Sequence, residues 1–218
     1  MKLHQHVLAF SAASAMLFAG AAHAEAPTAN LYVKGRLDVP TCTISSPNDG
    51  TYDFGNIGST MIKTGTATTA LDPKSQTWTA SCGAKTYLSF SMTDNRKDSV
   101  SSPGDSNFGL GNVNETGKLG YYQITMENAM VDNVASNVYA TNNGTISSNT
   151  AGSSKKLSSN SAYQHGWAKG TTAQAMGEVF TADLVVAPTL AGSATMNGPL
   201  TDAVDLDGSA TLTFAFGL

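Results

Sequence analysis

Apolar and polar residues alternate along much of the chain, and a period of two residues predicts β-strands. The first such run has apolar or small residues at every second position and polar or aromatic residues between them. Its inward-facing positions would be Leu31, Val33, Gly35, Leu37 and Val39. Pro40 ends the run, because proline has no backbone N–H to donate to a sheet. This pattern predicts a half-buried strand over residues 31–39.

Similar alternating segments recur at short intervals through the rest of the chain. We expect strands at residues 51–57, 75–82, 87–92, 118–126, 178–186 and 208–218, with a glycine-rich segment at 107–112. Clusters of Gly, Asn, Asp and Ser separate these segments, and such clusters are typical of turns. Strands at this spacing predict a single all-β domain, a sandwich of two sheets.

Two parts of the chain interrupt this pattern. Residues 141–162 are mostly Asn, Ser, Gly, Thr and Lys, which predicts a long flexible polar loop within a domain of residues 25–218. Residues 1–24 combine a basic start at Lys2, an apolar stretch and an Ala22-His23-Ala24 exit, the pattern of a secretory signal peptide. No later apolar stretch is long enough to span a membrane as a helix.

Cleavage of this leader changes the charge balance and places the chain in an oxidising compartment. Without Lys2 the chain has 11 basic and 16 acidic residues, a net charge of −5, which argues against binding to nucleic acid. Cys42 and Cys82 are the only cysteines, and an exported chain would join them in a disulfide. A bridge closing such a loop would stabilise the fold by about 4 kcal/mol.

Residues suited to catalysis or metal binding are sparse. His165 has no second histidine to share a metal once the leader is removed, and in its polar surroundings we expect it to be solvated. Asp202, Asp205 and Asp207 lack the spacing of a calcium loop and its closing Glu, so we expect a solvated turn. Nucleophile-elbow, zinc-protease and phosphate-loop motifs are absent. We therefore expect neither an enzyme nor a cofactor or metal site.

The larger aromatic residues are expected either to pack in the core or to form an exposed contact. Trp78 alternates with threonines near Cys82, which favours packing in the core against the disulfide. Trp167 lies beside the polar loop and is the better candidate for an exposed contact. Tyr121 and Tyr122 would join it if exposed, because aromatic faces stack on sugars.

Several motifs together resemble a known group of exported proteins. They are Leu31-x-Val-x-Gly-x-Leu-x-x-Pro-x-Cys42, Tyr52-Asp-Phe-Gly-x-Ile57, Asn107-Phe-Gly-Leu-Gly-Asn112 with Lys118-Leu-Gly-Tyr-Tyr122, and Asp207-Gly-Ser-Ala-Thr-Leu212. In this order and spacing they resemble the GltF-like fimbrial-type exported proteins, which are related to chaperone–usher pilins.

The resemblance implies an immunoglobulin-like, pilin-type β-sandwich that lacks its last strand. It also implies a structural subunit of a fimbria-like surface fibre of a Gram-negative bacterium, which contributes to adhesion. Its partners would be a periplasmic chaperone, an outer-membrane usher and neighbouring pilus subunits, and it would pass through the periplasm to the cell surface. Assembly would proceed by donor-strand exchange, in which an added strand pairs through main-chain hydrogen bonds and fills pockets with alternate side chains.

The two ends of the chain are the candidate pairing segments. In the C-terminal strand, one face would be buried in the groove, and the backbone edge would pair with the chaperone or the next subunit. This face carries Ala210, Leu212, Phe214, Phe216 and Leu218. At the other end, Leu31, Val33, Gly35 and Leu37 form either the domain's own first strand or the donor strand. If the domain completes its own sandwich, the alternative is a monomeric periplasmic or surface module that binds a carbohydrate or a protein.

Overall fold

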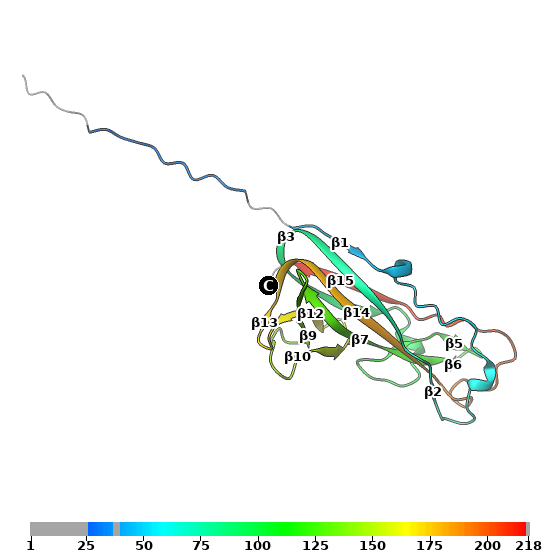
Figure 1. Cartoon of the computed structure of the whole chain (residues 1–218). Coiled ribbons are helices and arrows are strands. Elements are labelled where there is room, and N and C mark those ends of the chain that lie inside the picture. Colours follow the sequence, from blue (N-terminus) through cyan, green and yellow to red (C-terminus); the bar gives the residue numbers. More distant parts are fainter. Residues whose placement is uncertain (1–25, 37–39, 217–218) are drawn as a thin grey trace, which may run out of the picture. The chain divides into compact units, whose positions relative to one another are not determined.

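The computed structural model describes residues 26–36 and 40–216 (Figure 1). The chain divides into an N-terminal segment and a domain that begins near residue 38. The expected signal peptide, Met1–Ala24, lies outside the described residues, as do Leu37, Val39 and Leu218. None of the helices in the described ranges is long and apolar enough to cross a membrane.

The domain is built almost entirely of antiparallel strands with three short 3-10 turns. The strands are β1 (Cys42–Ser45), β2 (Thr69–Ala70), β3 (Lys74–Asp94), β4 (Phe108–Gly109), β5 (Asn112–Val113), β6 (Gly117–Lys118), β7 (Gly120–Val131), β8 (Val134–Ala135), β9 (Asn137–Thr141), β10 (Ala151–Gly152), β11 (Ser154–Lys156), β12 (Gln164–Lys169), β13 (Ala173–Gln174), β14 (Met176–Leu190) and β15 (Ala210–Phe216). The turns are η1 (Pro47–Gly50), η2 (Ser59–Met61) and η3 (Lys97–Ser99).

Two sheets share the long strand β3. In the first sheet, β14 pairs with residues 74–87 of β3 on one side and with β7 on the other, while β1 pairs with residues 79–82. In the second sheet, residues 88–94 of β3 pair with β15, and residues 89–90 pair on the other side with β12. β12 pairs in turn with β9, and β9 with β10. Because β3 passes from one sheet into the other, it ties the two layers together. The prediction of an all-β sandwich is confirmed.

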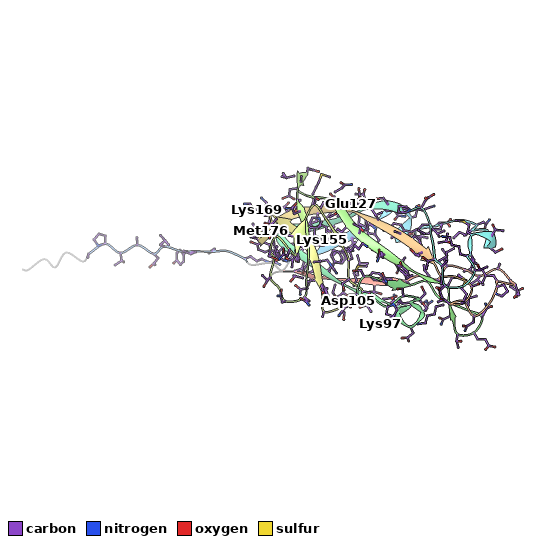
Figure 2. All side chains as sticks on the ribbon, turned by 90° about the horizontal axis from the view of Figure 1, so that it is seen from below. Lys97, Asp105, Glu127, Lys155, Lys169 and Met176 are labelled. Carbon is purple, nitrogen blue, oxygen red and sulfur yellow. A yellow bond between two sulfur atoms is a disulfide. The ribbon has the colours of Figure 1, made fainter. Side chains whose placement is uncertain are left out.

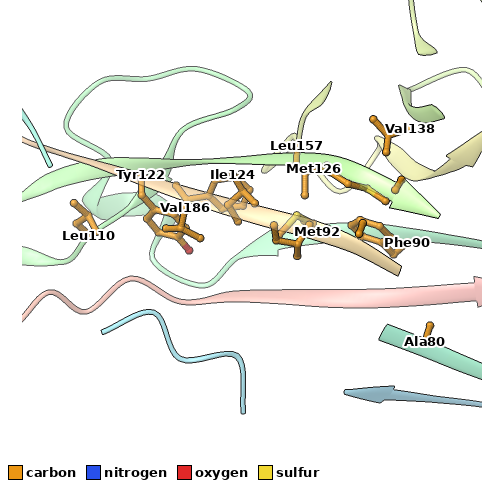
Figure 3. Packing of buried hydrophobic residues seen from close by; sticks show 14 of the residues in the cluster. Ala80, Phe90, Met92, Leu110, Tyr122, Ile124, Met126, Val138, Leu157 and Val186 are labelled. Atoms are coloured by element: carbon orange, nitrogen blue, oxygen red, sulfur yellow. The ribbon is translucent and has the colours of Figure 1, made fainter. Parts of the chain in front are cut away.

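The core lies between the two sheets and follows from alternation within the long strands. In β7, residues Tyr122, Ile124 and Met126 are buried, and every second residue between them is more exposed. They pack with Phe90 and Met92 of β3 in one cluster of buried side chains. Figure 3 shows this cluster as a row from Leu110 and Tyr122 at one end to Phe90 and Val138 at the other. Charged side chains such as Lys97, Asp105 and Lys169 are exposed at the periphery (Figure 2).

The disulfide between Cys42 and Cys82 is present and joins β1 to β3, as predicted. The two cysteines are directly opposite each other in the antiparallel register. The bridge therefore fixes the short strand β1 at the edge of the first sheet.

Residues 31–36 do not form the half-buried strand that their alternation predicts. The segment 26–36 contains no helix or strand, and Leu31 and Val33 are 86% and 89% exposed. The first strand of the domain is instead β1, which begins at Cys42. An alternating pattern only shows that a segment suits a sheet, and the partner strand that would bury it can belong to another chain.

Other differences from the predictions concern polar or short segments. Residues 51–57 form no strand, although Tyr52, Phe54 and Ile57 pack against the core as predicted anchors. Residues 141–162 are not simply a loop, since they contain β10 and β11 and bury Leu157 completely. Ala151 and Leu157 are buried in this stretch, and Ile146 packs against the cluster that contains Ala151, so apolar residues anchor this polar part of the chain.

Candidate functional site

An open groove runs between the two sheets on the side where β1 and β15 lie. Both strands pair with β3, and neither has a strand partner on its other edge among residues 40–216. A cavity of about 350 Å³ opens at one end of the groove, between the segment 50–54 and the start of β15. A smaller hollow continues it, lined by Ile44 of β1 and Phe214 of β15. The two hollows share Trp78, Leu184 and Leu212 in their walls, so they are parts of one groove.

The strand β15 presents an incompletely covered apolar face to this groove. Ala210, Leu212 and Phe214 are only half-buried, although they pack against the core, and Thr211 and Thr213 face the other way and are exposed. The ring of Phe214 contacts that of Phe90, with 5.4 Å between centroids. These three residues of the predicted pairing face therefore line or border the groove. Phe216 does not, because it turns to a recess elsewhere and is 42% exposed.

The opposite wall is held in place by Tyr52 and Trp78. The indole N–H of Trp78 donates to the Tyr52 hydroxyl (3.1 Å), which in turn donates to the carbonyl of Leu184 (2.8 Å). Burial raises the pKa of Tyr52 to about 12, so the phenol keeps its proton at neutral pH. This hydrogen-bonded chain attaches the segment 51–54 to β3 and β14, and the side chains of Gln76 and Lys74 in β3 also donate to the carbonyls of Thr51 and Asp53. The side chain of Trp78 therefore lines the groove. Its neighbours in the sequence did not predict this position.

No charged side chain lines the groove within the described part of the domain. Its floor is formed by core residues such as Met92, Ile124 and Val186. Tyr122 also lines it, and burial raises the pKa of this tyrosine above its ordinary value. An occupant of the groove therefore needs apolar side chains for the floor and main-chain groups for the free edge of β15. An extended strand with alternating apolar residues meets both requirements.

The segment 26–36 has the character of such a strand. Its described apolar residues, Leu31 and Val33, alternate with Tyr32 and Lys34. A Cβ built on Gly35 would meet no atom within 4 Å, so nothing in its own surroundings requires a glycine. The choice of glycine would be explained if another surface approaches this position closely.

Two predictions about chemistry-bearing residues are wrong, those for His165 and Trp167, and Tyr122 does not meet the condition of exposure that was set for it. His165 is fully buried in β12, not solvated; Ser158 N–H donates to its Nε2 (3.2 Å), and burial lowers its pKa to about 4. Trp167 is 5% exposed and donates to the carbonyl of Thr181, so it is not a surface contact. Tyr122 is likewise buried. His165 and Trp167 lie in β12, in which four successive residues are buried, and their polar neighbours in the sequence conceal this.

The three aspartates near the C-terminus are exposed, in keeping with a solvated turn. Asp207 forms an ion pair with Arg96 (2.6 Å). Among residues 26–36 and 40–216, no group of three or more His, Cys, Asp or Glu side chains is arranged to hold a metal ion.

Part of the chain matches a known family model. A family model described as "Protein of unknown function (DUF1120)" matches residues 31–124, from the exposed N-terminal segment into β7. A search of curated proteins finds no match to this chain. Over its N-terminal part, the chain is therefore similar to a family whose function is undefined.

Proposed function

We propose that this protein is a structural subunit of a fimbria-like surface fibre of a Gram-negative bacterium and assembles by donor-strand exchange. The observation that carries the proposal is the open, uncharged groove between β1 and β15, with a free main-chain edge on β15. Before assembly a periplasmic chaperone would occupy the groove, and an outer-membrane usher would then exchange it for the next subunit. Both partners follow from the resemblance to chaperone–usher pilins.

The N-terminal segment of a neighbouring copy supplies a suitable donor. Fully extended, residues 25–39 would reach about 50 Å, whereas the seven residues of β15 need about 23 Å. The donor therefore has length to spare for the connection between two domains. Its exposed Leu31 and Val33 would enter the groove, and Gly35 would lie where the groove is shallowest.

The same features count against a self-complete monomer. In a self-complete module, one of the domain's own strands would cover Leu212 and Phe214. In this structure both residues are only half-buried. Exposed edges of this kind promote unwanted pairing unless they are blocked. A subunit whose edge is covered by a chaperone and then by a neighbour avoids that cost.

The test is to shear surface material from cells that express the tagged chain together with its chaperone and usher. Polymers joined by exchanged strands are non-covalent, so unboiled material should give a ladder on a denaturing gel that collapses to one band on boiling. A single monomer band in unboiled material would overturn the proposal.

Matched variants separate the donor from the groove. Val33→Asp would place a charge against the apolar floor and abolish the ladder, whereas Lys34→Asp, on the opposite face of the donor, would keep it. Leu212→Asp in the groove would abolish the ladder, and the exposed neighbour Thr213→Asp would not. A ladder that survives both Val33→Asp and Leu212→Asp would exclude this mode of assembly.

A further inference from the structure

The outer face of the second sheet carries a recess that is separate from the open groove. It holds about 480 Å³, within the range of roughly 300–1,000 Å³ typical of small-molecule sites. Its walls come from β3, β9, β12, β13 and β15 and from Gly144 and Ile146 of the segment after β9. None of its lining residues also lines the groove. Figure 1 shows β9, β10, β12 and β13 gathered at one end of the long strands. We refer to this hollow as the outer recess.

A row of paired residues across four strands explains its depth. Tyr139 of β9 is opposite Gly166 of β12, which is opposite Ser89 of β3, which is opposite Ala215 of β15. Residues paired in this way point to the same face of the sheet. Gly166 lets the Tyr139 ring lie directly against the sheet, and the small side chains of Ser89 and Ala215 line the recess beside it. A Cβ on Gly166 would lie 2.9 Å from Cε1 of Tyr139 and 2.8 Å from the carbonyl oxygen of Leu88, so only glycine allows this packing.

The polar groups of the recess are neutral. The amide of Gln174 donates to the hydroxyl of Tyr139, and burial raises the pKa of this phenol, which stays protonated. Within the described ranges, the buried Oε1 of Gln174 has no hydrogen-bond partner. Gln164 adds a further amide to the lining, whereas the hydroxyl of Thr141 already donates to Oδ1 of Asn143 (2.8 Å). Among residues 26–36 and 40–216, no Asp, Glu, Lys, Arg or His lines the recess.

Two aromatic side chains offer apolar surface at its rim. Tyr87 is half-buried and Phe216 is 42% exposed, and both line the recess. An ionic ligand would bury its charge here without a counter-charge, which is costly. A purely apolar ligand would leave the buried Oε1 of Gln174 without a hydrogen-bond partner. A pyranose ring has an apolar face for the aromatic rings and hydroxyl groups that both donate and accept.

We propose that the outer recess binds a neutral sugar unit of a glycan. The site is independent of strand exchange, because the groove-facing residues of β15 are Ala210, Leu212 and Phe214, whereas Ala215 and Phe216 line the recess. A fibre subunit could therefore present the recess while its groove is filled. Binding here would give every subunit its own weak contact with a glycosylated surface.

The test is an NMR titration of the full exported chain with methyl glycosides of glucose, galactose, mannose and N-acetylglucosamine, with glucuronic acid as the charged comparison. At least one neutral glycoside should give saturable shifts, at millimolar concentrations, in residues of the recess. Absence of saturable shifts for all four neutral glycosides would overturn the proposal. If glucuronic acid bound equally well or more tightly, the proposal that the recess prefers neutral sugars would be overturned.

Variants with matched controls locate the contact. Tyr87→Ala should weaken binding about tenfold, whereas Tyr121→Ala, a half-buried tyrosine outside the recess, should leave it unchanged. Thr172→Ala is an exposed change in the lining that should weaken binding without affecting the fold, and Thr213→Ala on β15 is its control. Affinity that is unchanged in both Tyr87→Ala and Thr172→Ala would show that the sugar binds elsewhere.

Discussion

The buried imidazole of His165 makes the stability of the domain depend on pH. The ring is fully buried beside Phe90, with 5.5 Å between centroids. Its Nε2 accepts the N–H of Ser158, and its Nδ1 has no partner in the described part of the chain. Burial lowers the pKa from 6.5 to about 4 in the folded state. The unfolded chain therefore binds a proton more readily, and acid favours unfolding.

The sign and size of the effect follow from this difference. The contribution of His165 is fully present above pH 6.5, falls as the pH drops below that value, and is lost once the pH has passed about 4. Between pH 8 and pH 5 the linkage relation gives a loss of about 2 kcal/mol. This window leaves most carboxylates ionised, because their ordinary pKa values are near 4. The hydrogen bonds from Glu178 and Val179 lower the pKa of Asp132 further, so it stays charged.

The measurement is urea unfolding of the domain at several pH values between 5 and 8, with His165→Gln as the comparison. Glutamine offers an oxygen to the N–H of Ser158 but does not titrate, so its free energy of unfolding should be nearly flat over this range. An equal slope in the two proteins would refute the reasoning. A chain that starts at Glu25 has His165 as its only histidine, so its imidazole signal also gives the pKa directly. A value near 6.5 in the folded state would refute burial as the cause.

Three further changes test the packing of the domain by chemical denaturation. Replacing Cys42 and Cys82 together with serine should cost about 4 kcal/mol, because the bridge closes a 40-residue separation; a loss below 1 kcal/mol would contradict the entropic account. Gly166→Ala should cost about 1–3 kcal/mol and displace Tyr139, seen as a change in its NMR signals, since the added methyl has no room. Phe180→Ala should cost about 3–5 kcal/mol, because the ring is fully buried; a cost typical of surface positions would show that it is not in the core.

Alternation in the sequence was sufficient to predict most of the long strands. The runs around Tyr122, Val186 and Leu212 each place apolar residues on one face, and each became a strand with that face toward the core. The disulfide was predictable for a different reason, because a pair of cysteines in an exported chain has few other uses. These features depend on the residues themselves and their immediate neighbours.

The continuity of β3 and the positions of β9 to β13 were not predictable in the same way. Residues 83–86, Gly-Ala-Lys-Thr, interrupt the alternation and suggest a turn, yet the strand continues through them from one sheet into the other. Tyr139 and Gln174, which form part of the outer recess, lie in segments where no strand was expected. The sequence signal for the recess is faint, since its shape depends on one tyrosine and three small residues that come from four different strands.

The sequence by itself determined that this chain forms strands, which residues face inward in them, and which cysteines pair. Only the tertiary structure decided that residues 31–36 are exposed instead of forming the first strand, that His165 and Trp167 are buried, and that β1 and β15 leave a groove between them. The physical reason is that alternation records the periodicity of a strand but not its partner. Burial depends on which surfaces meet, and this is decided by residues far apart in the chain.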